Sequence, residues 1–302
     1  FDSATVSVTV TCLNDHPVAT DDSAAVDEDS TDNAIGLLDN DDDVDGDTLS
    51  VSAVGEPARG SAVNSTSDVA YTPDPDFCGG DAFTYTVADG HGGFDSATVS
   101  VTVTCINDDP VAVDDTASVD EDSTDDAIDV LDNDQDIDGD DLTVSAVGDP
   151  AHGSAANHAS YVSYTPDPDF CGGDTFTYTV ADGRGGFDTA TVSVTVTCVN
   201  DDPVAADDSA TVDEDSAGSV IDVLDNDTDV DGDDLTVSAV GDPAHGSAVN
   251  NTSDVAYTPD PDFCGGDTFT YTVSDGHGGF DSAAISVTVT CVNDDPVAAD
   301  DS

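Results

Sequence analysis

The sequence predicts an all-β chain organised as a tandem array of Greek-key β-sandwich domains. Three observations favour this fold class: a repeat of 93 residues, short segments in which apolar and polar residues alternate, and Gly- and Asp-rich turns between those segments. The motif TVTC marks the repeat, with cysteines at Cys12, Cys105, Cys198 and Cys291. A unit of about 93 residues can form a small independent domain, whereas a solenoid unit is shorter and cannot bury its apolar face alone.

The repeat divides the chain into three whole domains. They are expected to span residues 14–106, 107–199 and 200–292. Residues 1–13 are expected to be the last strand of a preceding repeat, and residues 293–302 the start of a further one. Because the sequence has no Met and opens within a strand-like segment, we expect it to be an internal piece of a longer protein.

Each repeat is expected to contain about seven short strands, and the second repeat illustrates them. Valines alternate with Thr and Ser over residues 187–198, and residues 175–181 and 142–147 show the same period of two. Phe187 is out of phase with these valines, which predicts a bulge or a later strand start. Seven strands per 93 residues, with no helical period, favour a sandwich of immunoglobulin or cadherin type. The predicted strands cover residues 110–119, 126–131, 142–147, 153–156, 161–165, 175–181 and 187–198.

The charge of the chain is extremely negative. The formal net charge is −66, with 68 Asp and Glu against two basic residues, Arg59 and Arg184. Such a surface has no row of cations with which to bind nucleic acid or anionic lipid. Salt near 1 M shortens the screening length to about 3 Å, so the composition is typical of a protein from a salt-rich habitat. The sequence contains no apolar run of the about 18 residues that a membrane-spanning helix needs.

The cysteines are spaced for one disulfide in each repeat. Cys171 precedes one long strand and Cys198 ends the next, and the two are equidistant from the hairpin turn ADGRGG. The equivalent pairs are Cys78 with Cys105 and Cys264 with Cys291. Each disulfide would close a loop of about 28 residues and contribute about 3.5 kcal/mol in the chain-entropy model. The alternatives are buried free thiols and zinc, which is disfavoured because the chain has no CxxC pair. Disulfides indicate a location outside the cytoplasm.

Each repeat also carries an acidic loop with the spacing DxDxDG. Oxygen ligands two residues apart, followed by a glycine that permits a sharp turn, suit a hard cation that needs six to eight oxygens. An EF-hand is excluded because no helices flank the loop and no Glu stands at its twelfth position. The alternative is a hydrated turn adapted to high salt. The spaced carboxylates are Asp41, Asp43 and Asp45, then Asp134, Asp136 and Asp138, then Asp227, Asp229 and Asp231.

Alternating strand directions are expected to bring further acidic segments to the end where the chain leaves each repeat. There the DxDxDG loop of the following repeat would meet them, which predicts shared metal sites between neighbouring repeats. The same alternative, a hydrated turn, applies to each of these segments. The candidate ligands are Glu28, Glu121 and Glu214 of the VDED segments, Asp74, Asp76, Asp167 and Asp169 of the DPD segments, and Asn107, Asp108, Asp109, Asn200, Asp201 and Asp202 of the linkers.

The motifs NDDP, VDEDS, LDNDxDxDGDxL, YTPDPDF and FTYTVxDGxGG occur in the same order along the chain. As an ordered set, the sequence resembles the cadherin-like, VCBS-type bacterial Ig-like repeats of long surface adhesins and filament proteins. The resemblance covers the whole chain and implies an extracellular β-sandwich array with calcium at the domain junctions. Two motifs depart from the cadherin pattern: the linker reads NDD or NDH instead of NDN, and DPD replaces DRE.

These features together predict a structural role. We expect a repeat segment of a long extracellular, secreted or cell-surface filament or adhesin stalk, stiffened by calcium and disulfides, whose partners are neighbouring repeats and other copies of itself. The alternative is an adhesive module that binds surface glycans or a protein, or that polymerises by strand donation. Enzymatic activity is not expected, because the chain has no GxSxG, HExxH or phosphate-binding loop.

Overall fold

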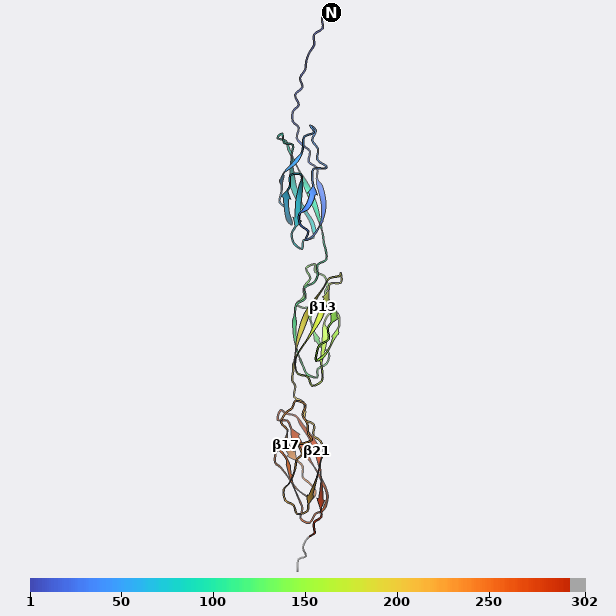
Figure 1. Cartoon of the computed structure of the whole chain (residues 1–302), viewed down its shortest axis with the longest axis vertical. Helices are drawn as coiled ribbons and strands as arrows, with labels where there is room; N and C mark the ends of the chain where they lie inside the picture. The colour runs from blue at the N-terminus through green and yellow to red at the C-terminus, as the bar shows by residue number, and fades with distance from the viewer. Residues whose placement is uncertain (294–302) are drawn as a thin grey trace, which may run out of the picture. The chain divides into compact units, whose positions relative to one another are not determined.

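The computed structural model describes residues 1–293, and its regular elements are 21 β-strands, seven in each repeat (Figure 1). The strands of the first repeat are β1 Asp22–Asp27, β2 Asn33–Gly36, β3 Ser50–Val54, β4 Gly60–Asn64, β5 Asp68–Pro73, β6 Gly79–Ala88 and β7 Phe94–Thr104. Those of the second are β8 Asp115–Asp120, β9 Asp126–Ile128, β10 Thr143–Val147, β11 Gly153–Asn157, β12 Val162–Pro166, β13 Gly172–Ala181 and β14 Phe187–Thr197. Those of the third are β15 Asp208–Asp213, β16 Ser219–Ile221, β17 Thr236–Val240, β18 Gly246–Asn250, β19 Val255–Pro259, β20 Gly265–Ser274 and β21 Phe280–Thr290.

The strands of each repeat form one four-stranded and one three-stranded sheet. In the first repeat the orders are β1-β7-β6-β3 and β2-β5-β4, and the other repeats have the same arrangement. The first strand pairs in parallel with the last, from Asp22 opposite Val99 to Asp27 opposite Thr104. The remaining pairs in this repeat are antiparallel. This topology confirms the predicted all-β sandwich array.

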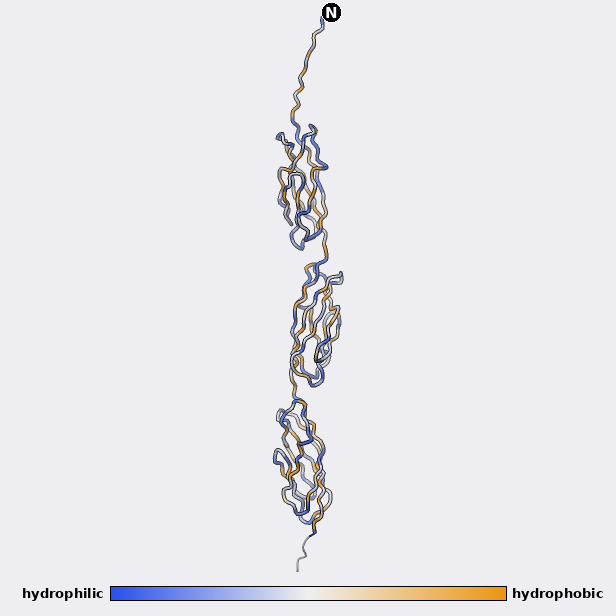
Figure 2. The backbone as a smooth tube through the Cα atoms, viewed as in Figure 1, coloured by the Kyte–Doolittle hydropathy of each residue, from blue (hydrophilic) through white to orange (hydrophobic). Residues whose placement is uncertain are grey.

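The core of each repeat lies between its two sheets and consists mainly of Val, Ile, Phe and Tyr. Along β7, the buried residues Ala97, Val99, Val101 and Val103 alternate with exposed or half-buried Thr and Ser. Figure 2 shows this mixture along the strands and hydrophilic residues in the loops between them. No helix long and apolar enough to cross a membrane occurs within residues 1–293.

A buried carboxylate ties the loop before the fourth strand to the core of each repeat. In the second repeat, Asp174 is 4% exposed and accepts hydrogen bonds from the Tyr164 hydroxyl (2.9 Å) and from the backbone N–H groups of Ala151 (3.1 Å), His152 (3.0 Å) and Thr175 (2.8 Å). Asp81 and Asp267 make the same contacts in their repeats. Burial alone would raise the pKa of Asp174, but these hydrogen bonds outweigh it and hold the pKa below its usual value.

Acidification is therefore expected to weaken the contribution of Asp174. A carboxyl whose pKa is lower in the folded state stabilises the fold above its unfolded pKa, near pH 4, and loses that contribution as the pH falls through the folded value. The variant Asp174→Asn cannot ionise there. We expect the difference in melting temperature between the wild type and D174N to shrink from pH 6 to pH 2 at constant salt, as followed by circular dichroism. A difference independent of pH would contradict this account.

The structure differs from the sequence-based expectations at Phe187, and the assignments at the two ends of the chain stay predictions. β14 starts at Phe187, which lies on the outer face of the sheet and is 57% exposed. In the third repeat the equivalent Phe280 of β21 pairs with Ser274 of β20 in a register without a bulge. Residues 1–13 form no strand in the structure, and their assignment to the last strand of a preceding repeat stays a prediction. Residues 294–302 of the predicted further repeat lie outside the described residues.

Contacts along the chain define two compact units. One comprises residues 1–113, 130–146 and 179–190, and the other comprises residues 114–129, 147–178 and the described residues from 191 onward. We call residues 105–110 and their surroundings the first junction, and residues 198–203 and their surroundings the second. Each of the candidate sites described below lies within one unit.

Candidate metal centres

The first junction gathers carboxylates from two repeats around the linker residue Asp108. Glu28 follows β1 in the first repeat, and Asp138 belongs to the acidic loop of the second. Oxygen atoms of Glu28, Asp108 and Asp138 lie within 4.8 Å of one another. The backbone N–H of Asp108 donates to Asp138 Oδ2 at 2.9 Å, and that of Ile106 donates to Glu28 Oε1. The linker is therefore bonded to both repeats beside this cluster.

Asp108 also belongs to a second cluster, with Asp29 and Asp76 of the first repeat, within the same 4.8 Å limit. Asp29 and Asp76 have φ values of 56° and 55°, the left-handed region that Asp tolerates better than most residues, and the Asp76 N–H donates to Asp29 Oδ1 at 3.1 Å. Burial, together with repulsion from Asp29 and Asp138 among other carboxylates, raises the pKa of Asp108. The clusters thus hold charge that is unfavourable without a counter-ion.

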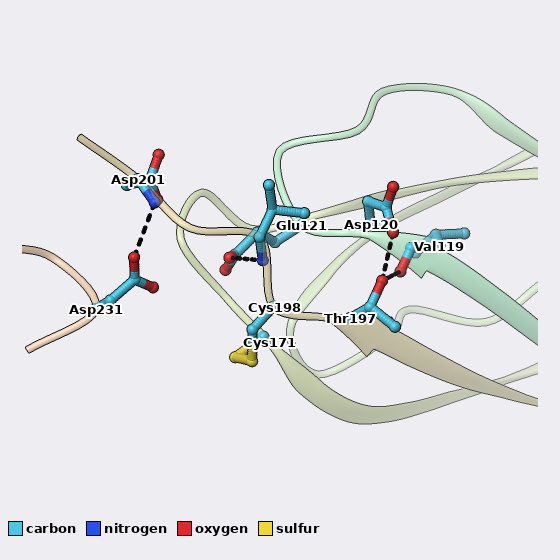
Figure 3. The surroundings of a disulfide bond; sticks show 9 residues. Val119, Asp120, Glu121, Cys171, Thr197, Cys198, Asp201 and Asp231 are labelled. Atoms are coloured by element: carbon cyan, nitrogen blue, oxygen red, sulfur yellow. Dashed lines mark hydrogen bonds between the residues drawn. A yellow bond between two sulfur atoms is a disulfide. The ribbon is translucent and has the colours of Figure 1, made fainter. Parts of the chain in front are cut away.

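The second junction repeats this geometry with residues of the same types. Glu121, Asp201 and Asp231 form one cluster, and Asp122, Asp169 and Asp201 form the other. Figure 3 shows the Asp201 N–H donating to Asp231 (2.8 Å) and Glu121 reaching back to the chain just after Cys198. Glu121 is 6% exposed, and its Oε1 accepts the N–H of Val199 at 2.6 Å.

The predicted disulfides are present in all three repeats, as Cys78–Cys105, Cys171–Cys198 and Cys264–Cys291. Each joins the residue before the sixth strand of its repeat to the residue after the seventh. In the second repeat the bond lies directly beside Glu121 (Figure 3). Cys198 therefore anchors the chain immediately before the linker residues of the second junction.

A third kind of cluster lies inside the acidic loop itself. Oxygen atoms of Asp43, Asp45 and Asp47 lie within 4.8 Å of one another. Asp43 is 8% exposed; its Oδ1 accepts the N–H of Asp45 at 2.9 Å, while its buried Oδ2 has no hydrogen-bond partner within the described part of the chain. The Oδ2 atoms of Asp136 and Asp229 are likewise buried without a hydrogen-bond partner in the described residues. A buried carboxylate oxygen without a donor is the arrangement expected of a cation ligand.

The first Asp of each DxDxDG motif forms hydrogen bonds with the body of its own repeat. Asp41 Oδ1 accepts the hydroxyl of the buried Tyr85 at 3.1 Å and the N–H of Thr20 at 2.8 Å. Asp227 accepts the Tyr271 hydroxyl at 2.9 Å, and Asp134 accepts the Val113 N–H at 2.7 Å. These three residues were predicted as ligands, and the structure gives them partners in the body of their repeats.

The remaining predicted ligands make the following contacts in the structure. Asn107 and Asn200 donate through Nδ2 to Asp182 (2.6 Å) and Asp275 (2.8 Å). Asp74 and Asp167 accept the N–H of Phe77 and Phe170 through their backbone carbonyls. Asp109 and Asp202 pack against the turn glycines Gly186 and Gly279, where an added Cβ would come within 2.8 and 2.9 Å of their Oδ1 atoms. Glu214 is 8% exposed and accepts the N–H of Val292, as its counterparts do.

Several residues of these sites were not among the predicted ligands. Asp29 and Asp122 follow the predicted Glu in VDED, and Asp47 follows the DxDxDG motif. Asp275 is 3% exposed and accepts hydrogen bonds from Asn200 Nδ2 and from the N–H of Gly279. The hydrogen bond from Asn200 is the main cause that lowers the pKa of Asp275 to about 2, and burial opposes it. All of these residues recur every 93 positions, and that recurrence was the available signal.

The donor sets of both junctions consist of carboxylate oxygens, which suit a hard divalent cation. Each linker aspartate bridges two clusters, and each acidic loop supplies an oxygen that is buried without a donor. The residues therefore fit calcium, which accepts six to eight oxygen ligands in flexible geometry. A cation held here would contact both of the adjoining repeats.

Comparison with known proteins agrees with this fold. A family model described as a bacterial Ig domain matches residues 14–102, 107–195 and 200–288. No match was found among curated proteins. Among solved structures, mouse cadherin-23 EC22-24 is 17% identical with a TM-score of 0.63, over 93% of this chain and all of that one. Human CDH23 EC21-23 is 14% identical with a TM-score of 0.57, over 90% of this chain and all of that one. Protocadherin gamma B2 EC1-5 is 18% identical with a TM-score of 0.61, over 95% and 62% of the two chains.

Proposed function

The chain belongs to the bacterial Ig domain family, and we propose from this membership and the junction clusters that it is a structural repeat segment of a long extracellular filament or adhesin stalk. Calcium bound at each junction holds neighbouring repeats together in this proposal. The observation that carries it is the position of Asp108 and Asp201, each of which belongs to two carboxylate clusters with residues of both adjoining repeats. The partners of such a segment are its neighbouring repeats and other copies of the same protein.

The residues of the chain have separate tasks in this mechanism. Glu28, Asp29 and Asp76 present oxygens from one repeat, Asp138 presents them from the next, and Asp108 connects the two sets. When bound, calcium neutralises the repulsion between these groups. The Asp108 and Ile106 amides donate to Asp138 and Glu28, and these hydrogen bonds hold both carboxylates beside the linker. Preorganisation of this kind lowers the entropic cost of binding.

The disulfides and the charge support an extracellular, salt-rich setting. Disulfides persist in oxidising compartments, and one per repeat stabilises a small domain that has a limited core. At a net charge of −66, screening by molar salt reduces repulsion between exposed carboxylates, while buried clusters are screened much less. The junction clusters therefore still need a bound cation under conditions in which the remaining surface does not.

Removal of divalent cations is expected to lower the melting temperature even in molar KCl. At free calcium 100-fold above Kd, one site adds about 2.7 kcal/mol to the free energy of unfolding, provided that the unfolded chain does not bind the ion. We expect a chelator to lower the transition by several degrees and calcium to restore it more effectively than magnesium. Melting followed by circular dichroism in 1 M KCl measures both.

The variant Glu121→Gln tests the second junction, because it keeps an acceptor for the Val199 N–H but removes the negative charge of a candidate calcium ligand. It is expected to retain the melting temperature in chelator and to lose part of the calcium-induced increase. If only the KCl concentration moves the transition, calcium at the junctions is rejected in favour of general screening.

A further inference from the structure

Positive charge is scarce in this chain, and both basic residues lie beside the first junction. Arg184 is in the hairpin turn of the second repeat, and its Nη2 lies 2.8 Å from Oδ1 of Asp140, whose side chain is 10% exposed. Arg59 of the first repeat places its guanidinium 5.7 Å from the ring centre of Phe77, the residue after Asp76. The only two Lys or Arg residues among 302 are thus next to acidic segments that meet at one junction.

Histidines occupy the equivalent positions at the second junction. His277 Nδ1 lies 2.7 Å from Asp233 Oδ2, which matches the contact of Arg184 with Asp140, and His152 stacks on Phe170 as Arg59 lies over Phe77. A guanidinium is charged at every pH at which proteins fold. The contacts are preserved, but only the first junction has side chains that carry a permanent positive charge.

The Arg184 contact acts on the loop that serves the first junction. The N–H of Asp140 donates to Asp136 Oδ1 at 3.2 Å, and Asp138, two residues earlier, belongs to the cluster with Glu28 and Asp108. The carboxylates of the two junctions are otherwise of the same types: Glu28 matches Glu121, Asp76 matches Asp169, and Asp138 matches Asp231. The arginines are therefore the difference in positively charged side chains between the two candidate metal centres.

We propose that Arg184, assisted by Arg59, acts as a built-in counter-ion that makes the first junction a weaker calcium site than the second, so that the two junctions load at different calcium concentrations. This inference rests on the proposed function. A fixed positive charge repels a divalent cation and partly neutralises the carboxylates that attract it. We expect a difference of about tenfold in the free calcium needed, which corresponds to about 1.4 kcal/mol.

The test follows each linker separately by hydrogen exchange and mass spectrometry at pH 8 across a series of free calcium concentrations. The Asp108 and Asp201 amides donate to Asp138 and Asp231, so peptides that cover residues 105–110 and 198–203 report the two junctions. In the wild type, protection of the second linker is expected at about tenfold lower calcium than protection of the first. The pair R59H and R184H should move the first midpoint down to the second, and the pair H152R and H277R should move the second up to the first.

All four substitutions together should reverse the order in which the linkers become protected. R184Q, which keeps a hydrogen-bond donor without the charge, should lower the first midpoint as R184H does, and unchanged exchange in the strands of each variant shows that it is folded. If the two midpoints are equal in the wild type, or if the substitutions do not move them, the proposed role of the arginines is wrong. The proposed function is not affected by that result. If calcium protects neither linker, the proposed function fails, and this inference fails with it.

Discussion

Replacing Asp174 by alanine is expected to unfold the second repeat well below the temperature at which the first and third repeats unfold. The change removes the acceptor for three backbone N–H groups and the Tyr164 hydroxyl, in a site that is 4% exposed. Each unsatisfied buried donor costs about 1–3 kcal/mol, and partial rearrangement or water entry reduces the sum. We expect a loss of about 3–5 kcal/mol, which is a large part of the stability of a domain of this size.

Calorimetry of the three-repeat chain measures this effect. A separate transition that contains about a third of the unfolding enthalpy should appear about 15–30 °C below the wild-type transition, since the enthalpy scales with the number of residues that unfold. The equivalent residues Asp81 and Asp267 remain intact and serve as internal references. Tyr164→Phe removes a hydroxyl that lies 2.9 Å from Asp174 Oδ2 and 3.0 Å from the His152 carbonyl oxygen, and it should cost only about 1 kcal/mol. A D174A chain that melts as the wild type would show that these contacts add little.

Removal of the second disulfide by the double variant C171S and C198S is expected to cost about 3.5 kcal/mol, because the unfolded chain regains the entropy of a loop of about 28 residues. A second effect follows from its position. Cys198 precedes Val199, whose N–H binds Glu121, so the linker loses an anchor next to the candidate metal centre (Figure 3). Chemical denaturation in chelator measures the first effect, and the calcium-induced increase in melting temperature measures the second.

The other two disulfides provide the controls. The pair C264S and C291S should destabilise the third repeat by a similar amount but leave the calcium dependence of the second junction unchanged. If both double variants alter that dependence equally, the anchoring role of Cys198 is wrong, although the entropic effect remains. If neither lowers the stability, the two bonds removed have no structural importance under the conditions tested.

The fold could be predicted because its signals are local and repeated. Alternation over residues 187–198 predicted β14 to within one residue at its end, and the symmetry of the hairpin predicted the partner of Cys171. The predicted strand at 110–119 is shorter in the structure, β8 at Asp115–Asp120, because residues near Val111 form only an isolated bridge to Gln135. The out-of-phase position of Phe187 predicted a bulge or a later strand start, whereas β14 begins at Phe187 with this side chain on the outer face.

The candidate metal centres were predictable in place but not in detail. The regular spacing within DxDxDG gives no reason to expect different contacts for Asp41 and Asp43. Their contacts differ because the Tyr85 hydroxyl, more than 40 residues away in the sequence, donates to Asp41. Likewise, Asn107 donates to Asp182 across 75 residues, so its amide nitrogen is engaged at the hairpin turn. Which oxygens meet at a junction depends on such long-range contacts, and residue type alone does not determine them.

The parallel pairing of the first strand with the last has a mechanical consequence. In the first repeat, β1 and β7 run in the same direction, from the pair Asp22 and Val99 to the pair Asp27 and Thr104. A force that pulls the two ends of the repeat apart therefore acts along these strands and loads their hydrogen bonds in shear. The bonds must then break together, not one after another, so a repeat under tension would yield at a higher force than a hairpin that unzips from one end.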